Sequence, residues 1–117
     1  EAAVLAVSDG RSAYDGPMFR GLTGSMGTSA LLKIDGVTVA VVSAREQPFD
    51  MAFARTLGVD CPSKKYICLK SAAHFRAAFE PIAGSIYNVD AAGIHTHDFR
   101  KLKYAKRTRP VFPVELS

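Results

Sequence analysis

The apolar positions of the chain fall into short runs separated by turn residues, a pattern typical of short strands and helices. The run at residues 2–7 predicts a buried strand that ends at the turn residues 8–10. The runs at 30–34 and 37–43 flank Asp35-Gly36, a preferred hairpin pair because both central residues of such a turn need positive φ. The sequence therefore predicts a β-hairpin, and its second arm is rich in β-branched residues, as a central strand should be.

Two short helices are predicted in the middle of the chain. Phe49, Phe53 and Leu57 lie four residues apart, as on one face of a helix. Asp50 is a suitable N-cap for this helix, and Gly58 suits its C-terminal end. The second helix follows Ser71, which can cap it, and its apolar residues have helical spacing: Phe75, Ala78, Phe79 and Ile82.

The segment around the second helix predicts a strand–helix–strand unit over residues 65–89. Residues 65–70 and 85–89 both have strand-like apolar content, and a helix between two such runs favours a right-handed parallel crossover. The predicted fold class is therefore α+β, with a mixed β-sheet that contains one β-hairpin and one strand–helix–strand unit, and with two short helices.

A long irregular loop is predicted at residues 10–28. Four glycines and Pro17 lie between residues 11 and 28, and loops of this length are usually functional or docked on their domain. We expect docking, because four apolar residues would otherwise be exposed: Met18, Phe19, Leu22 and Met26.

Composition limits the chain to a single ordered domain over residues 1–117. It has 117 residues, of which 48% are hydrophobic and 22% charged, which excludes a disordered chain. No apolar run reaches the roughly 18 residues that a membrane span needs, so no membrane association is expected. The chain opens at Glu1 directly into a strand-like run, without Met or a leader, and we expect it to be part of a longer protein.

The net charge of +4 comes from one segment, a basic C-terminal tail at residues 98–113. Without its run RKLKYAKRTR (residues 100–109), the chain has nine basic against eleven acidic residues. Nucleic-acid sites favour basic residues interleaved with several stacking rings, and this run holds only Tyr104. The tail therefore disfavours nucleic acid, although a binding module whose tail contacts nucleic acid or an acidic protein partner stays an alternative.

Two strand-to-helix junctions carry the candidate substrate-binding residues. Arg45 and Gln47 follow the second hairpin arm, and Ser71, His74 and Arg76 follow the predicted strand at 65–70. Strand ends are where α/β sheets place functional groups, and a parallel arrangement would bring both junctions to one edge. A guanidinium there, such as that of Arg45, can bind a carboxylate in bidentate fashion.

Each junction also has a structural interpretation. A contact between Arg45 and Asp50 would hold the first turn, and Ser71 would serve as a helix cap with His74 bonded to a neighbouring segment. Ser71 and His74 lack a nucleophile elbow and a carboxylate that would orient the imidazole. No catalytic residue is therefore predicted in the chain.

The remaining metal-binding and thiol residues predict no site. His95-Thr96-His97 could hold zinc with Asp98, but a site needs three or four ligands, and His74 is the only other histidine. No metal site is predicted, and a small autonomous metal protein is the weakest alternative. Cys61 and Cys68 are interpreted as a loop thiol and a buried strand residue.

Several motifs resemble the C-terminal domain of the microcystinase C (MlrC) family of zinc metallopeptidases. They occur in the order of that family and cover nearly the whole chain: SDGRSAYDGPMFRGL (8–22), REQPFD (45–50), LKSAAHFRAAFEPIA (69–83), VDAAG (89–93) and KYAKRTRPVFP (103–113). The segment at 95–97 departs from the Pro/Ser-rich stretch usual in the family.

The resemblance implies an accessory domain of a bacterial, cytoplasmic amide hydrolase. The implied cofactor is zinc, held by an N-terminal metallopeptidase domain, and the ligands of that zinc have no matching positions here. The implied partners are that N-terminal domain and a peptide substrate, whose cleft this domain would line. In such a cleft Arg45 and Arg76 are expected to bind a peptide carboxylate, and His74 a carbonyl or a developing oxyanion. The chain alone is expected to be inactive, and whether it forms a homo-oligomer stays open.

Overall fold

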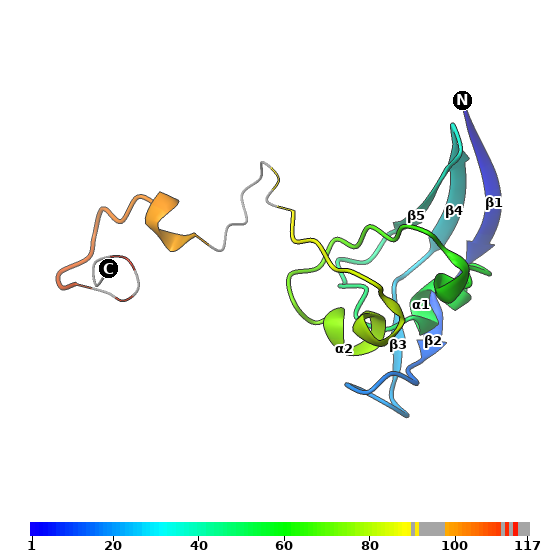
Figure 1. Cartoon of the computed structure of the whole chain (residues 1–117), viewed down its shortest axis with the longest axis horizontal. Helices are drawn as coiled ribbons and strands as arrows, with labels where there is room; N and C mark the ends of the chain where they lie inside the picture. The colour runs from blue at the N-terminus through cyan, green and yellow to red at the C-terminus, as the bar shows by residue number, and fades with distance from the viewer. Residues whose placement is uncertain (90, 92–97, 111, 113, 115–117) are drawn as a thin grey trace. The chain divides into compact units, whose positions relative to one another are not determined.

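The computed structural model describes residues 1–89, 91, 98–110, 112 and 114, and the chain divides into two units, Glu1–Ile86 and Tyr87–Ser117. The mixed α+β fold class is confirmed (Figure 1). The strands are β1 (Ala2–Ser8), β2 (Arg11–Ala13), β3 (Thr23–Ser25), β4 (Ser29–Ile34) and β5 (Val37–Val42). The helices are α1 (Ala52–Arg55) and α2 (Arg76–Phe79), and short 3₁₀ helices lie at Cys61–Ser63, Glu80–Ile82 and Phe99–Lys101.

A three-stranded antiparallel sheet has the order β1-β4-β5. β4 and β5 form the predicted hairpin, and Asp35 (φ 45°) and Gly36 (φ 86°) have the positive φ values that its turn requires. The prediction of β5 as a central strand is wrong, because β1 pairs with the other side of β4 and leaves β5 at an edge. β1 also has a one-residue bulge at Leu5.

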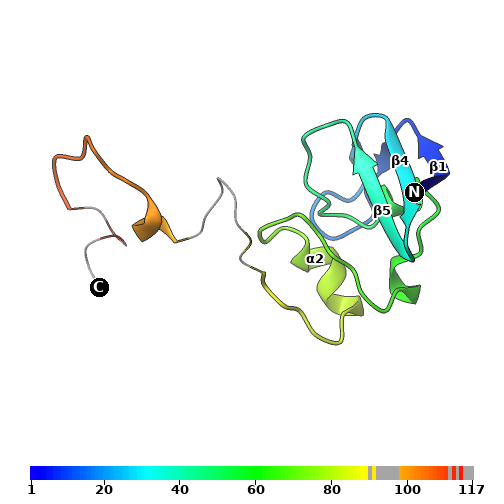
Figure 2. The same ribbon diagram turned by 90° about the horizontal axis from the view of Figure 1, so that it is seen from above.

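β1 is not the buried strand that its apolar sequence predicts. Val4, Leu5 and Val7 are 64%, 54% and 67% exposed. The end of the sheet with the hairpin turn projects away from both helices (Figure 1). α2 lies to the side of the sheet and not on it (Figure 2). The described part of the first unit therefore leaves much of this sheet uncovered.

The predicted irregular loop at 10–28 contains a second, two-stranded sheet, in which β2 and β3 pair antiparallel. Beyond β2 the chain turns back on itself, and the Tyr14 N–H donates to the Leu22 carbonyl (2.9 Å). Of the four apolar residues expected to dock, only Met26 is buried, with 6% exposure. Phe19 is 41% exposed but contacts Tyr14 and Phe49, so Met26 and Phe19 carry the expected docking and Met18 and Leu22 stay exposed.

An aromatic cluster attaches this loop to α1. It joins Tyr14 and Phe19 of the loop to Phe49 and Phe53, with ring centroids 5.1–6.4 Å apart in tilted or edge-to-face contact. Such pairs contribute about 0.5–1.5 kcal/mol each beyond the area that they bury. The Tyr14 hydroxyl lies against Gly24 of β3, where any Cβ would overlap it. The ring therefore requires glycine at that position.

Asp50 connects the same loop to the start of α1. Its side chain is buried, and its carboxylate accepts hydrogen bonds from the Gly16 N–H (2.9 Å) and the Ala52 N–H (2.8 Å). Met51 occupies the N-cap position that the sequence assigned to Asp50, so Asp50 precedes the cap and is shared by helix and loop. The helix is shorter than predicted, and Gly58 (φ 73°) has the expected left-handed conformation beyond its end.

The predicted strand–helix–strand unit is wrong, although its helix exists. Residues 65–70 and 85–89 form no strand. Leu69 instead packs on a core cluster with Ala78 and Phe79, so the apolar run is anchored by side-chain packing and not by a ladder. α2 is a single turn continued by the 3₁₀ helix that contains Pro81, and Ser71 is not its N-cap.

The two cysteines have the opposite burial to that predicted. Cys61 is 5% exposed and belongs to the core cluster, whereas Cys68 is exposed. Burial, together with the charge of Asp60, raises the pKa of the Cys61 thiol. The neutral thiol is therefore the form that the core favours.

In the second unit, Asp98 accepts from the backbone N–H of Arg100 and pairs with its guanidinium (2.8 Å), which lowers the pKa of the Asp98 carboxyl. Arg107 lies over the ring of Tyr104 at 5.8 Å.

The candidate ligands His95 and His97 lie outside the described residues. The single-domain organisation with a basic tail stays a prediction. Across the described ranges, no helix is long and apolar enough to span a bilayer.

Asp50→Ala should lower the free energy of unfolding by about 3 kcal/mol, because two backbone N–H groups lose a buried, charged acceptor. Asp50→Asn keeps one acceptor oxygen and should cost about half as much. Urea denaturation followed by circular dichroism measures both. Asp15→Asn is the matched control: Asp15 pairs with Arg55 at the surface, and its loss should cost less than about 1 kcal/mol. Equal losses for Asp50→Ala and Asp15→Asn would contradict the role assigned to Asp50.

Gly16→Ala should destabilise the chain by about 1–3 kcal/mol, because its Cβ would lie 2.7 Å from the Asp50 carboxylate oxygen. Gly84→Ala is the control, since a Cβ there meets nothing within 4 Å, and its effect should stay within about 0.5 kcal/mol. Calorimetric melting of the two variants gives the comparison. Similar melting of both would show that the loop accommodates the methyl group.

Candidate functional site

Three of the five predicted binding residues come together around one amide oxygen. Gln47 Oε1 lies 3.0 Å from the Ser71 hydroxyl, which donates to it, and 3.3 Å from His74 Nδ1. Gln47 and His74 are exposed, and Ser71 is half-buried. The two junctions therefore meet at the surface, although no parallel sheet brings them together.

Gln47 is placed by the segment that leaves β5. The Ala44 N–H donates to the Met26 carbonyl (2.9 Å), which holds the beginning of this segment against the loop. Beyond Gln47, Phe49 enters the aromatic cluster and Asp50 is buried. The amide is thus fixed on both sides by contacts that do not involve its own side chain.

Ser71 and His74 are placed by the turn that leads into α2. The Arg76 N–H donates to the Ala73 carbonyl (3.1 Å), which closes this turn around His74. Phe75 packs on the core cluster, and Phe79 is a buried member of it. Packing of the helix therefore sets the position of an imidazole that itself stays in water.

The contact with Gln47 determines which protons the site can offer. An amide oxygen only accepts hydrogen bonds, so both the Ser71 hydroxyl and His74 Nδ1–H are its donors. In the neutral imidazole this leaves Nε2 as an acceptor, and in the protonated ring Nε2–H becomes a donor. The group can therefore bind either an N–H or a carbonyl of a ligand through one ring nitrogen.

The two arginines of the prediction occupy different surroundings. Arg45 is exposed, and within residues 1–89 it forms no ion pair with Asp50, so the alternative structural contact is wrong. The Asp50 carboxylate instead accepts hydrogen bonds from the backbone N–H groups of Gly16 and Ala52. Arg76, on α2, pairs with Glu80 at 3.8 Å and lies over the ring of Phe75 at 5.6 Å.

Charged residues of both signs surround the neighbouring loop. Burial, followed by the charges of Glu46 and Asp50, raises the pKa of Tyr14. The Arg55 guanidinium hydrogen-bonds Asp15 and lowers the pKa of that carboxyl. Arg45 precedes Glu46 in the sequence and lies at the start of the segment that carries Gln47.

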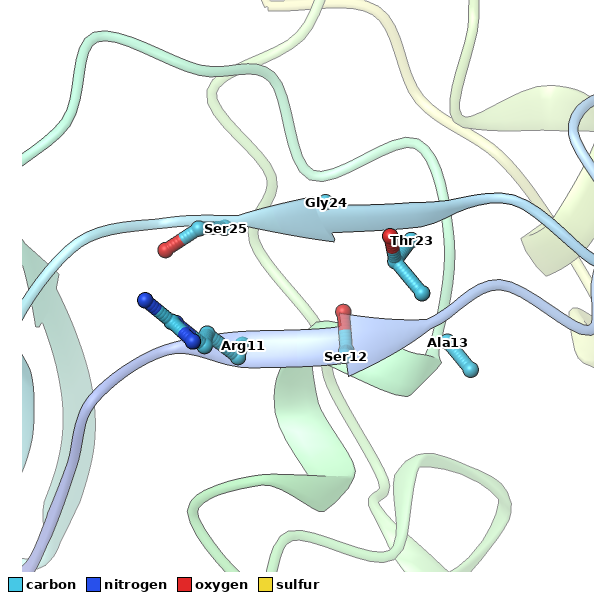
Figure 3. A pocket seen from close by; sticks show the side chains of 6 residues that line it. All are labelled: Arg11, Ser12, Ala13, Thr23, Gly24 and Ser25. Carbon is cyan, nitrogen blue, oxygen red and sulfur yellow. The ribbon is translucent and has the colours of Figure 1, made fainter.

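A zinc ion does not fit the described side chains. In residues 1–89, 91, 98–110, 112 and 114, no three His, Cys, Asp or Glu residues are grouped as ligands. A shallow hollow between β2 and β3 also contains none of the predicted site residues (Figure 3). Ser12, which lines it, has a buried hydroxyl oxygen without a hydrogen-bond partner.

Sequence reasoning missed the connection that holds the site segment, between Asp50 and Gly16. The glycines and Pro17 indicated an irregular loop, but nothing local indicated that a carboxylate 34 positions further on would accept the Gly16 N–H. The unpartnered Ser12 hydroxyl likewise gave no signal in the sequence.

The fold and these contacts describe a small α+β domain with a polar surface group and no complete catalytic set among its described residues. Comparison with protein families matches the family described as MlrC C-terminus over residues 1–106. The chain therefore belongs to the MlrC C-terminal family, as its motifs indicated. No curated protein and no solved structure matches it.

His74 should be found as the Nδ1–H tautomer when its ring is neutral, because Gln47 Oε1 can only accept. Nitrogen-15 NMR correlation of the imidazole at alkaline pH distinguishes the two tautomers. Gln47→Leu should shift the population toward Nε2–H, whereas Glu46→Gln, which leaves the amide acceptor in place, should not. An Nε2–H tautomer in the unsubstituted chain would show that this hydrogen bond does not form in solution.

Proposed function

We propose that this chain is the accessory C-terminal domain of an MlrC-like zinc metallopeptidase, an amide hydrolase in which it lines the substrate cleft. Family membership over residues 1–106 supports the setting. The observation that carries the proposal is the convergence of Ser71 and His74 on Gln47 Oε1 at the surface. The zinc, with its ligands, is proposed to lie in the N-terminal domain, which is the partner of this chain in a cytoplasmic bacterial enzyme.

The group is suited to holding a peptide in place. A neutral His74 accepts a peptide N–H at Nε2, and a protonated His74 donates to a carbonyl or an oxyanion there. Arg45 lies two positions before Gln47 and is exposed, so it can pair with a substrate carboxylate in bidentate fashion. These residues bind and orient the substrate, and the chain itself supplies no catalytic step.

In the full-length enzyme, Arg45→Ala and His74→Ala should each lower kcat/KM for a small linear peptide by about tenfold, or about 1.4 kcal/mol. Zinc content should stay unchanged, because neither residue is proposed as a ligand. Lys33→Ala, an exposed cation on β4, is the matched control and should leave the kinetics unaltered. Unaltered kinetics for both variants would overturn the assignment, as would peptide hydrolysis by the 117-residue chain alone.

A further inference from the structure

One face of the sheet β1-β4-β5 consists of aliphatic side chains only. Residues directly opposite one another on paired strands share a face, and Val4, Leu32 and Val39 form one such row. The rows on either side are aliphatic as well, and together the three rows form the aliphatic face: Ala2, Ile34 and Val37 on one side, Val7, Ala30 and Val41 on the other.

The opposite face of the same sheet has the composition expected of a half-solvated sheet. Lys33 and Thr38 lie there toward the hairpin end and are exposed. Ser29 and Leu31 lie there toward the core and are buried. This face therefore meets water at its hairpin end, through Lys33 and Thr38, and packs on the core at its other end. The aliphatic face has no polar side chain at all, which indicates that it is built to be covered.

The aliphatic face is open in the described structure. Val4, Val37 and Val41, on the two edge strands, are 64%, 61% and 48% exposed, and Val7 is 67% exposed. The largest apolar patch on a typical monomeric protein covers about 300–600 Å² and is often functional. Removing apolar surface from water is favourable in proportion to the area that is covered. Covering this face is therefore strongly favourable for any apolar layer that fits it.

The size of the face decides between a second copy and a segment of the same polypeptide. Three strands about 4.8 Å apart, with six residues each rising about 3.3 Å, cover roughly 300 Å². A stable complex of free proteins buries about 800 Å² on each partner, so this face alone is too small for a dimer. A covalently linked segment needs less area, because linkage raises its effective concentration. Any chain that precedes Glu1 would reach the sheet at Ala2, which belongs to the face.

We infer that the aliphatic face is the surface on which the N-terminal region of the MlrC protein docks. That region contributes an aliphatic layer, which completes a two-layer packing of the sheet. The inference rests on the proposed function only in taking this region to be part of the same protein. It does not depend on whether Gln47 and His74 touch a substrate.

Cysteine labelling tests directly whether the aliphatic face is covered in the full-length protein. In a Cys68→Ser background, Val41→Cys is compared with Thr38→Cys, its counterpart on the opposite face of β5, by maleimide reaction in the 117-residue chain and in the full-length protein. Val41→Cys should react about tenfold or more slowly in the full-length protein, and Thr38→Cys equally in both. Val4→Cys on β1 repeats the measurement if the first variant fails to fold.

Three outcomes would overturn the inference. Equal labelling of Val41→Cys and Val4→Cys in both proteins would show that nothing covers the face. Labelling of the 117-residue chain that slows as its concentration rises would assign the face to a second copy. Slow labelling of that chain at every concentration would assign it to residues of the chain itself. Protection at Val41 with unaltered kinetics of both the Arg45 and the His74 variants would overturn the proposed function alone. Lowered kcat/KM for these variants without protection at Val41 would overturn only this inference.

Discussion

The carboxylate of Asp50 is the contact on which the arrangement of the first unit depends. It is 3% exposed and binds two backbone N–H groups, one at the start of α1 and one in the loop that follows β2. A buried charge is tolerated only where hydrogen bonds replace its water, and here those bonds come from segments 34 positions apart. Asp50 and the aromatic cluster therefore together position the loop relative to the helix.

The polar group of Gln47, Ser71 and His74 is positioned by Asp50 on one side and by the core cluster on the other. Gln47 lies three positions before Asp50, with Pro48 restricting the backbone between them. His74 lies next to Phe75, which packs on the cluster of Cys61, Ala78 and Phe79. Two buried anchors, connected through Met51 and Ala54 on the core cluster, thus fix the two sides of one polar contact. This is how a domain with short helices can present an oriented imidazole without burying it.

The sequence predicted well what local chemistry decides. Asp35-Gly36 gave the hairpin because two positive φ values are a property of the turn itself. The run at 65–70 was wrongly predicted as a strand because apolar composition indicates packing and does not specify a pairing partner. Gln47, Ser71 and His74 do lie together, but through loop contacts and not at the edge of the parallel sheet that the sequence predicted. These contacts with Gln47, and the hydrogen bond between Gly16 and Asp50 that holds the same segment, join residues far apart in the sequence, and no local pattern encodes them.

The bulge at Leu5 has a consequence for how this sheet can vary. Val4 and Val7 lie three positions apart, so in a regular strand their side chains would point to opposite faces of the sheet. The extra residue, Leu5, places both side chains on the same face. Deletion of Leu5 would give a regular ladder with the same partners, so β1 can lose that residue and keep its pattern. Deletion within β4 would invert half of the side chains relative to both neighbours. Length changes are thus compatible with the outer strand and incompatible with the central one.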